Sequence, residues 1–424
     1  MNIPQVQWPQ ASVQTSNHDS NDGPASARTQ SEVGEPAVAI VQHFFAHYRG
    51  AVIRELITHG RYHYVFVGDT SDPLQSGIAC CNISKSRFIR TRSKFFGKFL
   101  VQAGLINLAF RPDIGTIVYL GDAQFLTTWI SAACARLAGK HVLFWSHGWP
   151  RLEKGIKDRI RCLFYRIGHG MVLYSNRSKA IGASKGFDPG NLHVIYNSLE
   201  SVEQKEWLDR KALGEVLGVR TRLFKTARRP MLICTGRLVK YRHLELLICA
   251  MDLLHAEGHP VNLLLVGDGP EESHLRELIH AKGLDDAVIF YGACYERREL
   301  ADLITAANVT VIPGRVGLTA VQSLAHGVPV ISHDDPDDQG PEWEAIVAGV
   351  NGDLYHHGDI DDLARKIKIW TWDESPDLRT RAACCEVVEK FYNPSYQRAV
   401  MDQAVAGQPA RDEIWKKWLP LVSS

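Results

Sequence analysis

The sequence predicts an α/β protein with two domains of similar build, each a parallel β-sheet covered by helices on both faces. Three observations predict this fold class: a length of 424 residues, short apolar runs that alternate with helical stretches, and glycine-rich turns after the runs. A chain of this length is long for one hydrophobic core and suits two domains of about 100–200 residues each. Apolar residues make up 45% of the chain and charged residues 22%, which is typical of a globular protein.

The apolar runs have the length and composition of buried parallel strands. In the first half they cover residues 37–41, 64–67, 117–120, 141–145, 171–174 and 192–195, with helices expected at 50–58 and 129–138. In the second half strands are expected at 230–235, 261–266, 288–291, 309–312 and 328–331, with helices at 244–256, 271–281, 297–306 and 318–326. Strands that alternate with helices pair in parallel, because each helix returns the chain to the same edge of the sheet.

Changes in composition divide the chain into four parts. Residues 1–35 are polar and rich in Ser, Asn and Gln, so they lack the apolar surface that ordering requires and are expected to be disordered. Residues 36–200 form the first domain and residues 201–395 the second, with the boundary in the charged, strandless segment between Asn197 and Arg229. Residues 396–424 are expected to be C-terminal helices.

The net charge of +1 hides an asymmetry along the chain. Residues 36–200 hold 21 Lys and Arg against 9 Asp and Glu, a net +12, while residues 1–35 carry −3 and the remainder −8. A basic first half favours an anionic partner. No apolar stretch reaches the roughly 20 residues of a membrane span, no secretory signal is visible, and the nine cysteines show no metal-binding spacing. We therefore expect a cytoplasmic protein with reduced thiols and no metal.

A basic loop follows the strand predicted at 230–235. Gly236 permits close approach of a ligand to the backbone, and the start of the next helix offers unpaired N–H groups. Arg237, Lys240 and Arg242 lie beside it, and a guanidinium binds phosphate through two parallel hydrogen bonds. The loop is therefore a candidate phosphate site, with a solvated basic loop as the alternative interpretation.

Two further loops in the second half have the same arrangement of strand, glycine and helix. Gly267 begins a Gly-Asp-Gly-Pro turn, which by itself is a weak signal because any strand–helix turn favours these residues. Gly314 and Gly317 precede the helix that holds Gln322, and two glycines before a helix can form a backbone cradle for an anion. A plain tight turn is the alternative interpretation of both loops.

Taken in order and spacing, these pieces resemble glycosyltransferase family 4, the retaining enzymes of the GT-B fold. The resemblance covers residues 192–391 and is carried by the segments 193–197, 236–238, 267–270, 288–292, 307–313, 326–331 and 344–352. It implies two Rossmann-like domains whose parallel sheets face a central cleft. It also implies that the last helix, near Trp415 and Trp418, crosses back onto the first domain.

The resemblance assigns roles in donor binding and catalysis position by position. Arg237 matches the arginine that holds the donor diphosphate, and Arg242 stands where the family usually has lysine, so both are expected to stabilise the leaving group. Glu344 matches a glutamate that helps to close the donor site. The expected donor-binding set is completed by Gly236, Lys240, Gly267, Gly292, Ala293, Gly314, Arg315, Gly317, Leu318, Thr319 and Gln322.

This chain departs from the family in its pair of glutamates, which are separated by seven residues. Gly314 stands at the first glutamate, which normally contacts the donor sugar, and Gln322 stands at the second, which contacts the ribose. The amide of Gln322 still hydrogen-bonds hydroxyl groups. Gly314 has no side chain, so backbone N–H groups or Arg315 are expected to position the sugar, as in a variant branch with Pro-Gly-x-Val-Gly-Leu in this loop.

In the first domain, His147 follows a predicted strand at the place where family histidines approach the donor sugar. Its alternative role is to cap the strand end. Arg49 and Gly50 occupy the first strand–helix loop, where the family usually has two glycines, and Arg49 is a candidate for contact with an acceptor phosphate. A surface arginine without a ligand is the alternative for Arg49.

Two segments of the first domain, 85–100 and 154–165, combine cations with bulky apolar residues at helical spacing. Such a pattern suits an anionic membrane surface, although an amphipathic helix whose apolar face is core has the same pattern. No nucleic-acid-binding module is visible, so the charge is not interpreted as a nucleic-acid site.

The resemblance implies a metal-independent enzyme without cofactor that moves a sugar from a nucleoside-diphosphate sugar to a glycan or lipid-linked acceptor, with retention of anomeric configuration. The implied process is cell-surface polysaccharide or glycolipid synthesis at the inner membrane face. Two alternatives stay open: a GT-B sugar-nucleotide epimerase, for which no set of cleft carboxylates is visible, and a catalytically silent partner protein, which the missing glutamates favour.

Overall fold

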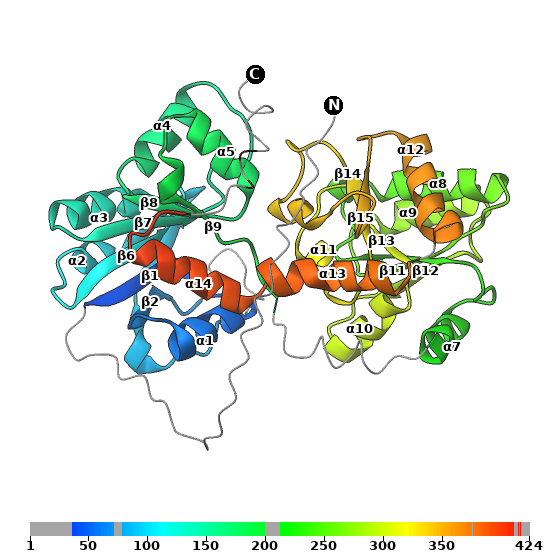
Figure 1. The fold of residues 1–424 in the computed structure, drawn as a ribbon, viewed down its shortest axis with the longest axis horizontal. Coiled ribbons are helices and arrows are strands. Elements are labelled where there is room, and N and C mark those ends of the chain that lie inside the picture. The colour runs from blue at the N-terminus through cyan, green and yellow to red at the C-terminus, as the bar shows by residue number, and fades with distance from the viewer. Residues whose placement is uncertain are drawn as a thin grey trace, which may run out of the picture.

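The computed structural model of the protein describes residues 36–71, 79–199, 213–374 and 376–410, together with Ile414 and Lys416. Two parallel β-sheets, each covered by helices, form two lobes that lie side by side (Figure 1). The predicted α/β class with two parallel-sheet domains is confirmed. The tail predicted at 1–35, the boundary at residues 200 and 201, and both Trp415 and Trp418 lie outside the described residues.

The first sheet has seven strands in the order β3-β2-β1-β6-β7-β8-β9. The strands are β1 (Ala37–Phe44), β2 (Tyr64–Asp69), β3 (Phe88–Arg90), β6 (Ile114–Leu120), β7 (His141–Ser146), β8 (Gly170–Leu173) and β9 (Leu192–Val194). The helices of this lobe are α1 (Gly50–His59), α2 (Leu105–Leu108), α3 (Leu126–Leu137), α4 (Ile156–Tyr165) and α5 (Asn176–Ser184). The central strands are buried on both faces, which explains their continuous apolar runs. The strand order reverses between β1 and β6, where such sheets bind ligands.

The second sheet has six strands in the order β12-β11-β10-β13-β14-β15, and its order reverses between β10 and β13. The strands are β10 (Met231–Thr235), β11 (Asn262–Val266), β12 (Val288–Gly292), β13 (Val309–Val311), β14 (Val330–His333) and β15 (Gly352–Tyr355). The helices are α7 (Leu213–Leu223), α8 (Leu244–Ala256), α9 (Glu272–Ala281), α10 (Arg297–Thr305), α11 (Leu318–Ala325), α12 (Ile360–Lys368) and α13 (Leu378–Phe391).

The chain leaves the second lobe along α13 and returns to the first as α14 (Pro394–Val405), as Figure 1 shows. α13 packs on α11, and α14 packs on α1. Asp402 of α14 is buried and accepts a hydrogen bond of 2.7 Å from the hydroxyl of Tyr64 in β2. Together, these contacts make α14 part of the first lobe.

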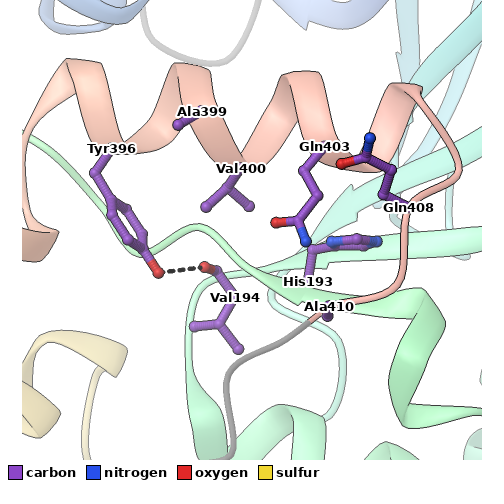
Figure 2. A pocket seen from close by; sticks show the side chains of 8 residues that line it. All are labelled: His193, Val194, Tyr396, Ala399, Val400, Gln403, Gln408 and Ala410. Carbon is purple, nitrogen blue, oxygen red and sulfur yellow. Dashed lines mark hydrogen bonds between the residues drawn. The ribbon is translucent and has the colours of Figure 1, made fainter. Parts of the chain in front are cut away.

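A pocket of about 410 Å³ lies between β9 and α14 (Figure 2). Its lining residues are His193, Val194, Tyr396, Ala399, Val400, Gln403, Gln408 and Ala410. The Tyr396 hydroxyl donates to the carbonyl of Val194 across it at 3.3 Å. None of these residues follows the carboxyl end of a strand at a switch point, so the pocket is a feature of the α14 packing.

Most predicted elements agree with the structure to within a few residues, and the bounds predicted for α8 are those observed. The helical spacing predicted for 85–100 is wrong, because this segment forms β3 and the hairpin of β4 (Arg92–Phe96) and β5 (Phe99–Ala103). Exposed and half-buried residues alternate along β4, a period of two that is typical of a strand. The segment predicted to be strandless before Arg229 contains α7.

Candidate functional site

A pocket of about 210 Å³ lies at the carboxyl ends of β10, β11 and β12, beside the first turns of α11. Six of the predicted donor-site residues line it: Gly236, Arg237, Gly267, Ala293, Thr319 and Gln322. The rest of the lining was not among the predicted site residues and consists of Thr235, Val266, Asp268, Cys294, Tyr295 and Leu300. The structure thus brings together three strand–helix loops that lie far apart in the sequence.

Glycine is required in these loops because their backbones touch. A Cβ on Gly267 would lie 2.1 Å from the carbonyl oxygen of Gly236, and Gly267 has a φ of +144° that side chains rarely adopt. The Gly236 amide donates to Val266 at 2.8 Å, and the Gly267 amide donates to Gly292, the last residue of β12, at 2.8 Å. The floor of the pocket is therefore a set of mutually hydrogen-bonded main chains.

The two predicted arginines occupy different places in the β10 loop. Arg237 is exposed and lines the pocket, where its guanidinium is available to an anion. Arg242 donates from Nη1 to the carbonyl of Thr235 at 3.0 Å, and a Cβ on Gly236 would lie 2.5 Å from its Nη2. Arg242 thus supports the loop from behind, while Lys240 is exposed at the start of the short turn Lys240–Arg242.

The loop before α11 shows why the first family glutamate is missing. A Cβ on Gly314 would lie 2.2 Å from the carbonyl oxygen of Tyr241, and the Gly314 amide donates to Arg242 at 2.9 Å. The β13 loop is therefore packed directly on the β10 loop, and no side chain fits at position 314. Gly317 and Leu318 follow at the start of α11.

Arg315, the neighbour expected to replace the glutamate, is engaged elsewhere. Its Nη2 lies 2.7 Å from Asp338 Oδ1 in an exposed ion pair, and Arg315 is not among the residues that line the pocket. On this side of the pocket the polar side chains in the lining are those of Thr319 and Gln322.

Glu344 lies at the junction of the two lobes and not in the pocket lining. It is buried in the turn Pro341–Ala345, and its carboxylate accepts hydrogen bonds of 2.9 Å from the backbone amides of Asn176 and Arg177 at the start of α5. The Asn176 side chain donates a third bond at 3.0 Å. Burial raises the pKa of Glu344 to about 7, and the N–H donors counteract that rise. Glu344 therefore caps a first-lobe helix from the second lobe.

A second polar cluster lies at the carboxyl edge of the first sheet. Arg49 donates to the Tyr174 hydroxyl at 3.1 Å and lies 5.3 Å from the ring centre of Trp145. The His147 ring stacks on Tyr174 with 4.6 Å between ring centroids. Desolvation by the surrounding protein, followed by the charge of Arg49, lowers the pKa of His147, so the ring is neutral at neutral pH. Tyr174 thus joins two residues that the sequence had singled out separately.

Gly50 begins α1 directly after Arg49. Tyr174 was missed by sequence reasoning because an aromatic residue at the end of an apolar run looks like core. The partners of Glu344 were missed for a similar reason, since Asn176 and Arg177 read as an ordinary helix start.

The lobes are also joined by charge. Arg177 of α5 pairs with Asp337, and Arg151 donates from Nε to the Asp337 carbonyl at 2.7 Å and lies 3.7 Å from Asp338. Asn197 donates to Glu342. Part of the basic charge of the first lobe therefore faces carboxylates of the second lobe, and His147 belongs to the same loop as Arg151.

Solved structures of other proteins have the same two-lobe fold. The solved structure of Anabaena Alr3699/HepE in complex with UDP superimposes with a TM-score of 0.65 at 15% identity, covering 88% of this chain and 100% of that one. The apo lipopolysaccharide outer core galactosyltransferase WaaB superimposes with a TM-score of 0.63 at 14% identity, covering 88% and 99%. The fold is therefore GT-B, as the sequence resemblance implied.

Sequence comparisons find glycosyltransferases similar to parts of this chain. Residues 220–384 match the family model described as glycosyl transferases group 1. The putative glycosyltransferase EpsD of Bacillus subtilis is 26% identical over 249 residues, 56% of this chain and 62% of that protein. A GDP-mannose-dependent α-(1-6)-phosphatidylinositol monomannoside mannosyltransferase of Mycobacterium tuberculosis is 27% identical over 250 residues, 55% and 61%. The matched region spans about three fifths of these relatives, so the chain has the GT-B fold and is similar in sequence to glycosyltransferases over its second lobe and part of its first.

Proposed function

We propose that this protein is a glycosyltransferase that moves a sugar from a nucleoside-diphosphate sugar to a glycan or lipid-linked acceptor with retention of anomeric configuration. The observation that carries the proposal is the pocket at the ends of β10, β11 and β12. It combines an exposed arginine, close-packed glycine backbones and the start of α11, and these features together suit an anion.

Two side chains of this pocket suit the two polar parts of a nucleoside diphosphate. Arg237 supplies a guanidinium for the diphosphate, and the amide of Gln322 supplies donors and acceptors for ribose hydroxyls. Similar proteins use or bind donors of this kind. The Anabaena protein was solved with UDP-glucose and with UDP plus glucose, and the Mycobacterium relative is named as GDP-mannose-dependent.

In the proposed reaction the protein stabilises the charge that builds on the departing diphosphate. Arg237 and the N–H groups at the start of α11 face that charge from the second lobe. His147 and Arg49 belong to the first lobe, where His147 would approach the donor sugar and Arg49 an acceptor phosphate. The neutral ring of His147 suits hydrogen bonding to a sugar hydroxyl without competing for the diphosphate.

We also propose that the acceptor is met at an anionic membrane surface, through α4. Ile156, Ile160 and Leu163 follow one face of α4 and have exposed fractions of 76%, 47% and 62%. Lys154, Lys157 and Arg159 are exposed beside them. An exposed apolar stripe flanked by cations is typical of a helix that lies on a bilayer. No helix in the described residues is long and apolar enough to span one.

The donor assignment is tested by thermal unfolding of the chain with a panel of nucleoside diphosphates, with and without divalent metal. One diphosphate at about 100 times its Kd should stabilise the fold by roughly 2.7 kcal/mol. Arg237→Ala should lose most of this shift and most of the transfer activity, whereas Arg228→Ala, an exposed arginine before β10, should keep both. Equal shifts in the two variants would remove Arg237 from the donor site.

The membrane assignment is tested by sedimentation with vesicles of anionic and of neutral lipid. The native chain should bind the anionic vesicles, and replacement of Ile156, Ile160 and Leu163 by Ser should abolish binding. Leu378→Ser, which changes an exposed leucine of the second lobe, is the matched control. Binding that survives the triple replacement would assign the contact to another surface.

One specific observation favours the silent-partner alternative. Position 314 has no side chain, and the Glu344 carboxylate is bound to the start of α5 and not directed to the pocket. The two functions separate in the same assay. A diphosphate that binds without any turnover or hydrolysis of its sugar nucleotide would favour the silent partner. Measurable turnover would favour the transferase.

A further inference from the structure

Three loops at the carboxyl edge of the second sheet bring two histidines and a carboxylate together. His243 precedes α8, Asp338 lies after β14, and His357 follows β15. One ligand atom from each residue lies within 4.8 Å of the other two. The three residues are far apart in the sequence, so no ligand spacing was visible there. None of them lines the donor pocket.

The ring nitrogens of this cluster have partners suited to metal ligands. Glu245 Oε1 lies 3.2 Å from Nδ1 of His243. A carboxylate in that place holds the proton on Nδ1 and leaves Nε2 with a free lone pair, the arrangement found behind most metal-bound histidines. Asp335 Oδ2 lies 3.6 Å from Nδ1 of His357, which is close enough for an ion pair but longer than a hydrogen bond.

A third histidine completes the polar surroundings. His333 is fully buried, and its ring centroid lies 4.4 Å from that of His357. Its Nδ1 accepts the backbone amide of Asp335 at 3.2 Å, while its buried Nε2 has no hydrogen-bond partner among the described residues. The loop after β14 also carries four aspartates, at positions 334, 335, 337 and 338. The Oδ1 atom of Asp338 accepts a hydrogen bond from Arg315, which leaves its Oδ2 atom to bind another partner. The surroundings favour a cation.

The backbone of His243 is strained in a way that glycine would relieve. Its φ of +52° and ψ of +38° lie in the left-handed region, and Tyr196 is the other non-glycine residue there in the described chain. This conformation is less favourable for a residue with a Cβ than for glycine. An imidazole is thus held at a position where glycine would fold more easily, and such outliers accumulate at ligand sites.

We propose that His243, Asp338 and His357 bind a first-row divalent transition metal of the zinc class. Two imidazole nitrogens and one carboxylate oxygen are ligands that zinc takes at about 2.0–2.2 Å in a tetrahedral site, with the fourth position left to water. Tetrahedral geometry at that bond length places ligand atoms about 3.4 Å apart. His357 is exposed, and His243 and Asp338 are half-buried, so small side-chain rotations bring their atoms from within 4.8 Å to this separation. The site goes beyond the donor chemistry and does not depend on it.

The test is a zinc titration of the tag-free full chain against a chromophoric chelator, with thermal unfolding as the second readout. The native chain should bind one equivalent of Zn²⁺ and gain stability with it. His357→Ala and Asp338→Asn should each weaken binding at least tenfold and abolish the gain. His243→Gly should do the same while folding at least as readily, because glycine fits the left-handed backbone.

The matched control is His280→Ala, which removes an exposed histidine that also pairs with an aspartate, Asp285. It should bind zinc like the native chain. Binding that is equal in the control and in the His243 and His357 variants would overturn the proposal, as would failure of the native chain to withdraw zinc from the chelator. The metal cluster and the donor pocket share no residue, so zinc and nucleoside diphosphate should each still bind when the other is present, and failure of one proposal is distinguishable from failure of the other.

Discussion

Replacement of Gly314 by alanine tests the explanation for the missing glutamate. The new Cβ would lie 2.2 Å from the Tyr241 carbonyl oxygen and 2.8 Å from Arg242 Cα, in a loop held by the Gly314 amide bond to Arg242. Ordinary contact begins near 3.4 Å, so the two loops must separate by about an ångström. Overpacking of this kind costs about 2–3 kcal/mol, which in a domain of this size lowers Tm by roughly 5–10 °C.

The assay is urea and thermal unfolding of the ligand-free protein, with Gly317→Ala as the control. Gly317 belongs to the same loop, has an extended backbone, and a Cβ there meets nothing within 4 Å. The control should stay within about 0.5 kcal/mol of the native chain. If Gly314→Ala were as stable as Gly317→Ala, the contact between the loops could not be what excludes a side chain. A glutamate at 314, as the family has it, should then be restorable without loss of stability.

Three further predictions concern other polar contacts. Glu344→Gln keeps the size of the side chain but replaces one oxygen that accepts from an α5 amide by an NH₂ group. The free energy of unfolding in urea should therefore fall by about 1–3 kcal/mol. A fall below about 0.5 kcal/mol would contradict the capping role. Burial lowers the pKa of His193 to about 4, below the 6.5 of an unfolded histidine, so the unfolded chain binds the extra proton. Stability should therefore fall by about 3 kcal/mol as pH drops from 6.5 towards 4, and His193→Phe should lack this part of the acid sensitivity; identical pH profiles would refute it. Arg49→Met removes a nearby positive charge, so the pKa of His147, followed by NMR titration, should rise but stay below that of an exposed histidine because burial remains; an unchanged pKa would contradict the coupling.

The order of strands and helices was predictable because buried parallel strands leave a strong signal. Residues 37–41 of β1 and 263–266 of β11 form unbroken apolar runs, and the turns after these strands contain glycine. The hairpin of β4 and β5 was not predictable in the same way. Its cations and aromatic rings fit helical spacing as well as alternation, and the contact of Phe95 with His43 that orients the strand is distant in sequence.

The candidate site was predictable to the level of its loops but not of its side chains. Gly236, Gly267 and Arg237 line the pocket, as predicted. They were predictable because local turn chemistry indicates where a backbone can approach a ligand. Arg315 and Glu344 are engaged with Asp338 and with α5, which are partners that no local pattern reveals. Tertiary contact between loops, and not the residue type, decides which charged groups remain available to a ligand.

The loop after β14 connects the two lobes to the proposed metal site. Asp337 and Asp338 contact Arg177 and Arg151 of the first lobe, while Asp338 also pairs with Arg315 and lies beside the histidines. A metal bound to Asp338 would weaken the attraction between the Asp338 carboxylate and Arg151. We therefore expect metal binding and the contact between the lobes to influence each other. Linkage requires this effect to be reciprocal. If a bound donor or acceptor changes the affinity of the protein for the metal, the metal changes the affinity for that donor or acceptor by the same factor. Zinc affinity measured with and without the stabilising nucleoside diphosphate therefore reports whether this loop moves when the donor binds.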